Sequence, residues 1–265
     1  MSESSATRGE RSKSAILKYA YIGNIEDTLD ALQALAIDED WTYLRTTFTK
    51  PFPILYSYLT HTFARIEEEG KILESGDYSC FNTGLVTENQ QEIFMLFKKG
   101  GKGWYFLEFC KESDHNMGKF TLLPERASYF TEPSDLIYDP RAVLRINVDH
   151  IIEDEENFKR FPSDIQALPK LQLMNTLNGA IEHAKKRVKR NYKTAIPQFY
   201  RGKYVAEGHL QLLLPLCLKD PVVADLALAV TKHDGFYSGK TCLTLDMAIN
   251  NARLIAKPDD EWLKP

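Results

Sequence analysis

The sequence predicts an α+β protein in which antiparallel sheets carry packed helices. Between segments of helical periodicity, β-branched and aromatic residues alternate over short stretches bounded by turn residues, which is the pattern of half-buried strands. No repeat or low-complexity linker interrupts the chain. We expect a single domain over residues 14–265, or two tightly joined halves divided near residue 160, after a flexible tail at 1–13. Apolar residues recur at helical spacing in four segments: 25–37, 51–70, 169–191 and 245–256.

The composition is that of an ordinary soluble globular protein, because 43% of the 265 residues are apolar and 26% are charged. The cysteines are far apart and form no C-x-x-C pair, so free thiols in a reducing cytoplasm are expected. The N-terminus lacks the apolar stretch of a secretory signal, and no run of about 18 apolar residues exists for a transmembrane helix. We expect a cytoplasmic protein without a membrane partner.

The first half of the chain predicts two helices followed by a meander of strands. Asn24 is a suitable N-cap for the helix at 25–37, and Gly70 ends the helix at 51–70. From Tyr78 the period of the apolar residues changes to that of strands. The expected strands are 78–86, 92–98, 103–109 and 120–123.

The second half begins with an irregular segment at 124–162, which prolines interrupt. His150 lies among acidic residues there, but its spacing from Asp149 and Glu153 makes no complete site, so no metal is expected. Strands are expected at 205–218, 222–230 and 236–243, between the helices at 169–191 and 245–256.

Pro215 lies inside the first of these C-terminal strands. A proline cannot donate a ladder hydrogen bond, so its presence predicts a bulge or an edge position.

Cations concentrate in segment 183–204, HAKKRVKRNYKTAIPQFYRGKY, although the whole chain has a formal net charge of −4. Aromatic side chains are interleaved with these charges. Such a segment creates a local positive field that favours a polyanion. The helix dipole stabilises cations at a helix C-terminus, but this effect falls off within the last turn and does not explain the cations beyond it. We assign nucleic-acid contacts to Lys185, Lys186, Arg187, Lys189, Arg190, Tyr192, Lys193, Tyr200 and Arg201.

Two short motifs have structural explanations beside their functional ones. The K-H-D-G sequence at 232–235 matches the pattern of adenylylated lysines, but too little chain follows for a nucleotidyltransferase domain, so a hairpin turn is the better interpretation. Asn82, Thr83 and Gly84 lie beside a strand, where they suit either a backbone that approaches a phosphate or base, or a β-bulge. P-loop, dinucleotide-binding and nucleophile-elbow motifs are absent, so those three chemistries lack support and any cofactor is unknown.

Asp225 and Asp246 lie in apolar surroundings, where a carboxylate needs a partner because an unpaired buried charge is costly. Arg253 follows Asp246 by two helical turns on the same face. Asn250 lies one turn along that face, and Asn251 is adjacent to it. The arrangement suits a structural ion pair, or a pocket floor in which Asp246 acts as acid, base or ligand-orienting group.

Several stretches of the chain resemble an uncharacterised family, the domain of unknown function 3825. The resemblance runs through nearly the whole chain from about residue 40, and Ile249 departs from it where an aromatic residue is expected. Some members are joined to LOTUS-type helix-turn-helix modules, which implies an association with RNA but no reaction. The stretches are FNTGL at 81–85, AIPQFY at 195–200, LQLLLPLCL at 210–218, ADLAL at 224–228 and TCLTLDMAINNARLI at 241–255.

We expect an RNA- or nucleotide-binding protein whose basic segment forms the rim of a C-terminal pocket. One alternative is a hydrolase or phosphodiesterase acting on RNA ends or a nucleotide, with Asp246, Arg253 and His209 as catalytic residues. The other is a protein–protein interaction module without a ligand. The residues expected in the pocket are Asn82, Thr83, Gly84, Gln198, Asp225, Asn250 and Asn251.

Overall fold

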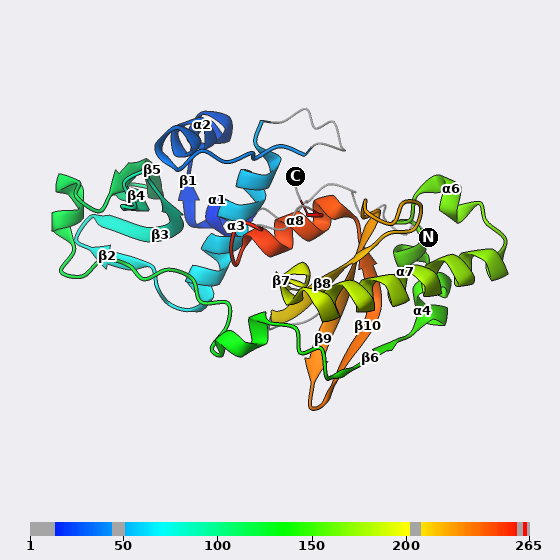
Figure 1. Ribbon diagram of the computed structural model, residues 1–265. Helices are drawn as coiled ribbons and strands as arrows, with labels where there is room; N and C mark the ends of the chain where they lie inside the picture. The colour runs from blue at the N-terminus through cyan, green and yellow to red at the C-terminus, as the bar shows by residue number, and fades with distance from the viewer. Residues whose placement is uncertain (1–13, 44–50, 202–207, 259–261, 264–265) are drawn as a thin grey trace, which may run out of the picture. The chain divides into compact units, whose positions relative to one another are not determined.

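A computed structural model describes residues 14–43, 51–201, 208–258 and 262–263 (Figure 1). The chain divides into two compact units, one formed by Met1–Glu39 and Lys50–Ala127 and the other by Asp40–Thr49 and Ser128–Pro265. The second of these boundaries, after Ala127, comes earlier in the chain than the division predicted near residue 160. The reason is that the proline-rich segment supplies a strand and helices to the second unit. The predicted α+β class is confirmed. The tail expected at 1–13 lies outside the described residues.

The first unit packs helices against a sheet of strand order β1-β5-β4-β3-β2. β2 to β5 pair antiparallel as expected, whereas β1 adds a parallel pair at the edge. The elements are α1 (Ala15–Tyr19), β1 (Ala20–Tyr21), α2 (Ile25–Leu35), α3 (Pro53–Glu68), β2 (Leu73–Ser75), β3 (Tyr78–Val86), β4 (Glu92–Gly100), β5 (Gly103–Lys111) and η1 (His115–Lys119).

Apolar side chains pack on both faces of this sheet, on one of them over only part of the strands. On the α3 face, the Phe63 and Phe81 rings meet edge to face at 5.0 Å between centroids, and Phe97 stacks on Phe81 at 6.1 Å. On the other face, Met117 and Phe120 pack with a cluster of buried strand residues. The prediction of a strand at 120–123 is wrong. No strand forms there, and Phe120 instead packs into this buried cluster.

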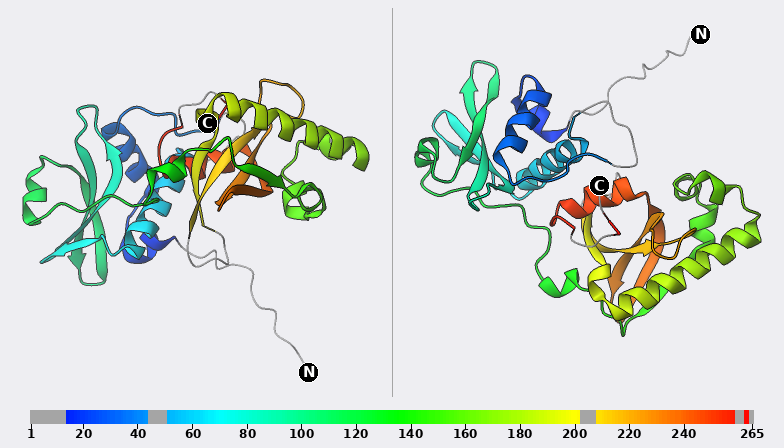
Figure 2. Two further views of the ribbon diagram at one scale, coloured as in Figure 1. Left: turned by 60° about the horizontal axis from the view of Figure 1, so that its bottom comes forward. Right: turned by 45° about the horizontal axis from the view of Figure 1, so that its top comes forward.

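The second unit has a sheet of strand order β6-β10-β9-β8-β7, again with a parallel pair at one edge. In the right-hand view of Figure 2 this sheet lies between α7 and α8. The elements are η2 (Pro133–Leu136), β6 (Val143–Ile146), α4 (Val148–Glu153), α5 (Glu155–Phe158), α6 (Ser163–Gln166), α7 (Lys170–Arg190), η3 (Tyr192–Thr194), β7 (Ile196–Tyr200), β8 (His209–Leu216), β9 (Leu226–His233), β10 (Phe236–Leu243) and α8 (Leu245–Arg253).

The core of the second unit forms between α7 and one sheet face. The apolar stripe predicted for α7 is buried against alternate residues of β8 and β9, such as Leu212, Leu214 and Val230. Because side chains alternate along a strand, Leu213 and Ala229 point to the opposite face, where α8 packs.

Two expectations for the C-terminal sheet have clear outcomes. Pro215 pairs with Ala227 beyond the end of β7, so β8 is locally an edge at that point, as predicted. The K-H-D-G hairpin is confirmed: His233 pairs with Phe236, and Gly235 in the turn has a φ of +76°. The strand predicted from residue 205 begins at His209 within the described residues.

Candidate functional site

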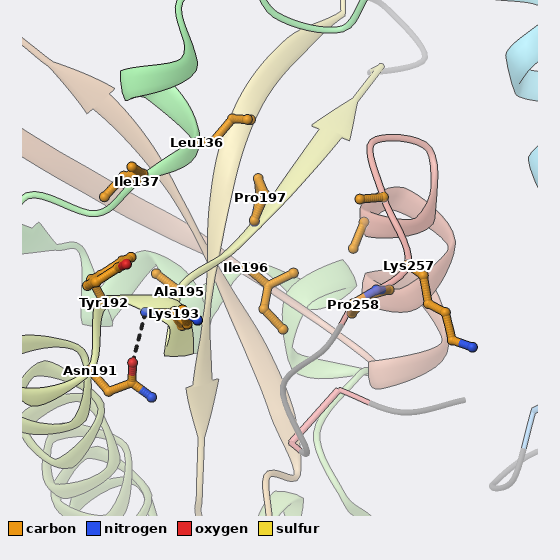
Figure 3. A pocket seen from close by; sticks show the side chains of 12 residues that line it. Leu136, Ile137, Asn191, Tyr192, Lys193, Ala195, Ile196, Pro197, Lys257 and Pro258 are labelled. Atoms are coloured by element: carbon orange, nitrogen blue, oxygen red, sulfur yellow. Dashed lines mark hydrogen bonds between the residues drawn. The ribbon is translucent and has the colours of Figure 1, made fainter. Parts of the chain in front are cut away.

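A pocket of about 530 Å³ lies along the edge strand β7 of the second unit (Figure 3). One wall comes from η2 and the residue after it, and another from the end of α8 and the chain that follows. The small side chains of Ala252 and Ala256, one helical turn apart, leave space beside β7. The lining residues are Leu136, Ile137, Asn191, Tyr192, Lys193, Ala195, Ile196, Pro197, Ala252, Ala256, Lys257 and Pro258.

The polar side of the pocket is the junction between α7 and β7. Asn191 Oδ1 accepts a hydrogen bond from the Lys193 N–H at 3.2 Å and caps η3. The Trp262 indole N–H donates to the Thr194 carbonyl at 2.9 Å, which holds the C-terminal segment against the same turn. The Tyr192 side chain is 51% exposed here.

The cations at the C-terminal end of α7 form two groups: those with a side-chain partner, and those that are exposed without an ion pair among the described residues, called here the open cations. Lys185 pairs with Glu182 at 2.5 Å. Arg187 donates to Cys217 Sγ at 3.8 Å, and the pKa of that thiol is raised by burial, with the guanidinium opposing the shift. The remaining cations of the helix end are exposed and carry no ion pair within the described part of the chain; they are Lys186, Lys189 and Arg190.

Beyond the pocket, the predicted RNA-contacting residues continue along β7. Tyr200 is 37% exposed and meets the His209 ring edge to face, with 5.7 Å between the centroids. Arg201 is exposed. Phe199, another aromatic residue of segment 183–204, is only 7% exposed and packs on Tyr129. His209 thus stands beside an aromatic ring of the adjacent strand.

Gln198 belongs to a row of amides on the α8 face of the sheet. Its Nε2 donates to Gln211 Oε1 at 2.9 Å, and Gln211 Nε2 donates to Thr231 Oγ1 at 3.0 Å. Asn251 of α8 donates to Gln198 Oε1 at 3.0 Å, so the fully buried amide is tied on both sides. Ser238 in β10 is the register partner of Thr231 and lies next in this row. The structure therefore joins Gln198 and Asn251 by a buried hydrogen bond, and neither they nor Asn250 line the pocket beside β7.

The polar face of α8 meets a segment from much earlier in the chain. Asn250 Nδ2 donates to the Tyr43 hydroxyl at 2.5 Å, and the Arg253 guanidinium lies 4.9 Å from the Trp41 ring centroid. The pKa of Tyr43 is raised above its ordinary value, mainly because the hydroxyl is buried. The hydrogen bond with Asn250 opposes this rise, and the negative charge of Asp246 adds to it. Sequence reasoning missed Trp41, which directly follows the acidic residues 38–40; its large ring is the signal that could have marked it as a packing residue.

Asp225 closes the loop between β8 and β9. Its Oδ2 accepts from the backbone N–H groups of Leu218 at 2.8 Å and Lys219 at 3.2 Å. These bonds explain how a carboxylate is accommodated in an apolar stretch. Asp225 does not line the pocket beside β7, and neither do Asp246 and Arg253.

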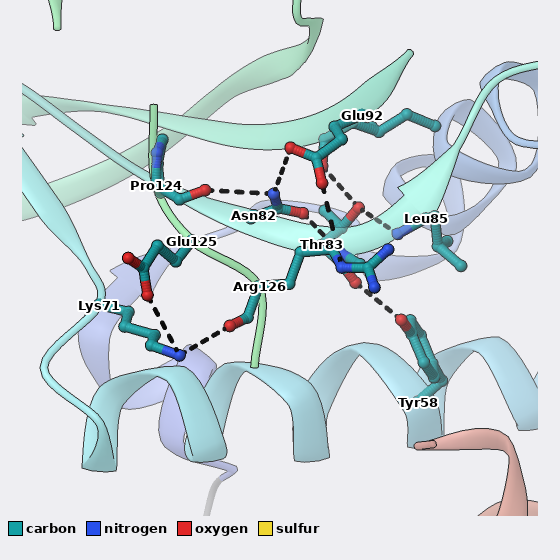
Figure 4. A network of polar contacts seen from close by, with 11 residues as sticks. Tyr58, Lys71, Asn82, Thr83, Leu85, Glu92, Pro124, Glu125 and Arg126 are labelled. Atoms are coloured by element: carbon teal, nitrogen blue, oxygen red, sulfur yellow. Dashed lines mark hydrogen bonds and ion pairs between the residues drawn. The ribbon is translucent and has the colours of Figure 1, made fainter. Parts of the chain in front are cut away.

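Asn82, Thr83 and Gly84 lie in the first unit, at a bulge of β3 (Figure 4). Asn82 donates to Glu92 Oε2 at 3.0 Å and to the Pro124 carbonyl at 3.2 Å, while its own Oδ1 accepts from the Gly84 N–H at 2.9 Å. Of the two interpretations left open, the β-bulge is the one formed.

Of the residues named for hydrolysis, Asp246 and Arg253 lie on α8, where they interact with Tyr43 and Trp41. His209 lies on β8 beside Tyr200. Hydrolase chemistry at Asp246, Arg253 and His209 stays a prediction. Across the described residues, no group of three or more His, Cys, Asp or Glu is placed to hold a metal ion. A helix long and apolar enough to cross a bilayer is likewise absent from the described part.

Fold and site together define an α+β protein with a cation-rimmed pocket in its second unit. A family model described as "Domain of unknown function (DUF3825)" matches residues 32–262. The chain therefore belongs to this family, and the resemblance seen in the sequence is confirmed. No curated protein and no solved structure matches the chain.

Proposed function

We propose that the protein binds single-stranded RNA or a nucleotide, with a nucleoside in the pocket beside β7 and phosphates against the basic end of α7. One observation carries the proposal: Tyr192 and Lys193, which continue that basic end, line the same pocket as Lys257. The volume of about 530 Å³ lies within the range of small-molecule sites, roughly 300–1,000 Å³. Apolar walls with a few polar groups at one side suit a planar base attached to a charged backbone.

The open cations supply the attraction to phosphate. Lys186, Lys189 and Arg190 are exposed on α7, and Lys193 is exposed at the pocket. Lys185 and Arg187 contribute less, because each already has a partner. Four phosphate contacts to a single strand correspond to a slope of log K against log salt of about −3.

The aromatic part of the site is Tyr192. Its half-exposed ring stands at the pocket between the cations of α7 and the apolar surface of Ile196 and Pro197. Stacking of a base on such a ring tolerates any sequence, since every base presents a π face. The site therefore favours single-stranded over duplex RNA.

Fluorescence anisotropy with a labelled single-stranded RNA across a salt series tests the proposal. Lys186→Gln with Lys189→Gln should weaken binding and make the salt slope shallower by about 1.4, because two phosphate contacts are lost. The matched control is Lys159→Gln with Lys170→Gln, which removes two exposed lysines of the same unit from outside the basic segment. A salt-independent affinity, or equal losses from both pairs, would contradict the proposal.

A second arm separates RNA from a free nucleotide. If the pocket holds one nucleoside, Tyr192→Leu should weaken the oligonucleotide and a mononucleoside monophosphate alike. If phosphate contacts along α7 dominate, the lysine pair should affect the oligonucleotide far more than the mononucleotide. An oligonucleotide affinity unchanged in Tyr192→Leu would remove the pocket from the site.

A further inference from the structure

A row of aromatic and cationic side chains crosses the sheet of the first unit. Tyr21 in β1 is the register partner of Tyr105 in β5, Tyr105 is that of Lys98 in β4, and Lys98 is that of Tyr78 in β3. Register partners on adjacent strands project from the same face of a sheet. These four residues, named here the aromatic–lysine row, therefore share one face, and Figure 1 shows their strands side by side.

This face is covered at one end of the strands and open at the other. Met117 and Phe120 cover the cluster that contains Phe94 and Leu96. At the row itself, Tyr21 is 69% exposed. Lys98 is exposed, and Tyr78 and Tyr105 are half-buried. The row thus presents ring surface to solvent beside a packed core.

The hairpin between β4 and β5 holds the Tyr105 ring in place. A Cβ added at Gly100 would lie 2.4 Å from Tyr105 Cε2, so the missing side chain at Gly100 makes room for the ring. The Tyr21 ring meets the Tyr105 ring edge to face, with 5.9 Å between centroids. The rings of two strands therefore form a continuous, supported aromatic surface.

The charge around the row is positive. Three lysines and no acid occur between Glu92 and Glu108: Lys98, Lys99 and Lys102. The Nζ atoms of Lys98 and Lys119 lie 6.0 Å and 4.7 Å from the centroid of the same Tyr78 ring. Lys119 Nζ donates to Asn116 Oδ1, and Asn116 Nδ2 donates to Glu108 Oε1 at 2.6 Å. Among the described residues, however, neither ammonium group at the Tyr78 ring lies within ion-pair distance of an acid, and this favours binding of an anion there.

We infer that the aromatic–lysine row is a second contact surface for single-stranded RNA, distinct from the pocket beside β7. Tyr21 and Tyr105 stack bases, and Lys98 and Lys119 hold the phosphates between them. This inference takes its ligand from the proposed function, but a different unit, sheet and set of side chains carry it.

The test measures RNA affinity by anisotropy for the full chain and its variants. Tyr105→Leu keeps an apolar cover over Gly100 and removes the stacking ring, so affinity should fall roughly 5- to 150-fold, the effect of losing one stacked base. Lys98→Gln with Lys119→Gln should make the salt slope shallower by about 1.4. The controls are Tyr56→Leu, an exposed tyrosine of α3, and Lys111→Gln, at the far end of β5.

Crosslinking makes the two sites distinguishable. With a 4-thiouridine oligonucleotide, crosslinked peptides should come from both 98–105 and 191–197. Crosslinks confined to 191–197, with full affinity in Tyr105→Leu, overturn the inference and leave the proposed function standing. Crosslinks confined to 98–105, with no effect of Tyr192→Leu, support the inference and remove the pocket. An absence of RNA binding by the wild-type chain removes both.

Discussion

At the scale of single residues, Gly84 sets the geometry of the β3 bulge. Its φ is +76°, and a Cβ there would lie 2.6 Å from the Tyr58 hydroxyl oxygen. That hydroxyl donates to the Thr83 carbonyl at 2.9 Å. We predict that Gly84→Ala lowers the free energy of unfolding by about 2–4 kcal/mol, because backbone strain and steric overlap add. Urea denaturation followed by circular dichroism measures the change.

Gly76→Ala is the matched control for this prediction. Gly76 also has a positive φ, of +57°, but no atom lies within 4 Å of its added Cβ. Gly76→Ala should lower the free energy of unfolding by the backbone strain alone, about 1–2 kcal/mol. Tyr58→Phe in the Gly84→Ala background should recover part of the loss, since the hydroxyl is removed. Equal losses at Gly76 and Gly84 would show that the contact with Tyr58 is unimportant.

The sequence alone left this bulge open to two interpretations for a physical reason. Small polar residues and a glycine let a backbone approach either a ligand or its own neighbouring strand. The choice depends on long-range partners, here Glu92 and the Pro124 carbonyl for Asn82. By contrast, the Asp-Gly turn at 234–235 was predictable because its chemistry is local.

At the scale of elements, the amide row joins three strands to α8. Gln211→Leu removes the acceptor of Gln198 Nε2, and Gln198 is fully buried. We predict a loss of about 1–3 kcal/mol in the free energy of unfolding, the penalty for an unpaired buried amide. Thr231→Val removes the acceptor of Gln211 Nε2, but Gln211 and Thr231 are both half-exposed, so it should cost less than about 1 kcal/mol. Denaturant titration of both variants gives the comparison, and equal losses would contradict the ordering.

Predictability of elements from sequence followed their length and period. The stripe of α7 repeats over 21 residues, so its bounds were predicted to within one residue. β7 is five residues long, contains Pro197 and follows a run of cations, so the sequence predicts no strand there. Its strand pairing comes from Leu210 to Leu213 in β8, which no local pattern around 196–200 indicates. The strand along which the pocket lies was therefore not predicted from the sequence, although the cations beside the pocket were identified.

At the scale of the whole molecule, buried thiols make stability depend on pH. Burial raises the pKa of Cys80, Cys110 and Cys242 to about 12. Because the folded pKa exceeds the unfolded one, this stability is complete below the unfolded pKa of about 8.5 and is lost as the pH rises toward 12. Each thiol contributes a slope of up to about 1.4 kcal/mol per pH unit in that window. The urea concentration at the unfolding midpoint should decrease as the pH is raised from 8 to 10. The decrease should be less steep for Cys242→Ala than for the wild-type protein.

The sequence could not reveal to which unit residues 40–43 belong. They follow a segment of the first unit along the chain, yet they belong to the second. Contiguity along the chain favoured one domain, or halves divided at a single point. The actual division depends on Trp41 and Tyr43 finding α8, a pairing across some 200 residues whose determinants are side-chain shape and one hydrogen bond.

Trp41 should therefore stabilise a unit from which it is distant in sequence. The side chain is 2% exposed, and its ring lies under the Arg253 guanidinium at 4.9 Å. We predict that Trp41→Ala lowers the free energy of unfolding by about 3–5 kcal/mol, because a large cavity opens beside α8. Hydrogen exchange should accelerate in residues 245–253 and less in β3 and β4 of the first unit.

Tyr43→Phe separates packing from hydrogen bonding at the same place. It keeps the ring and removes the hydroxyl that accepts from Asn250 Nδ2. Its loss should be about 0.5–1.5 kcal/mol, well below that of Trp41→Ala. If neither variant changes exchange in 245–253, the segment does not hold α8. If Trp41→Ala alone does, packing rather than the Tyr43 hydroxyl fixes this helix, and with it the Ala252 and Ala256 wall of the pocket.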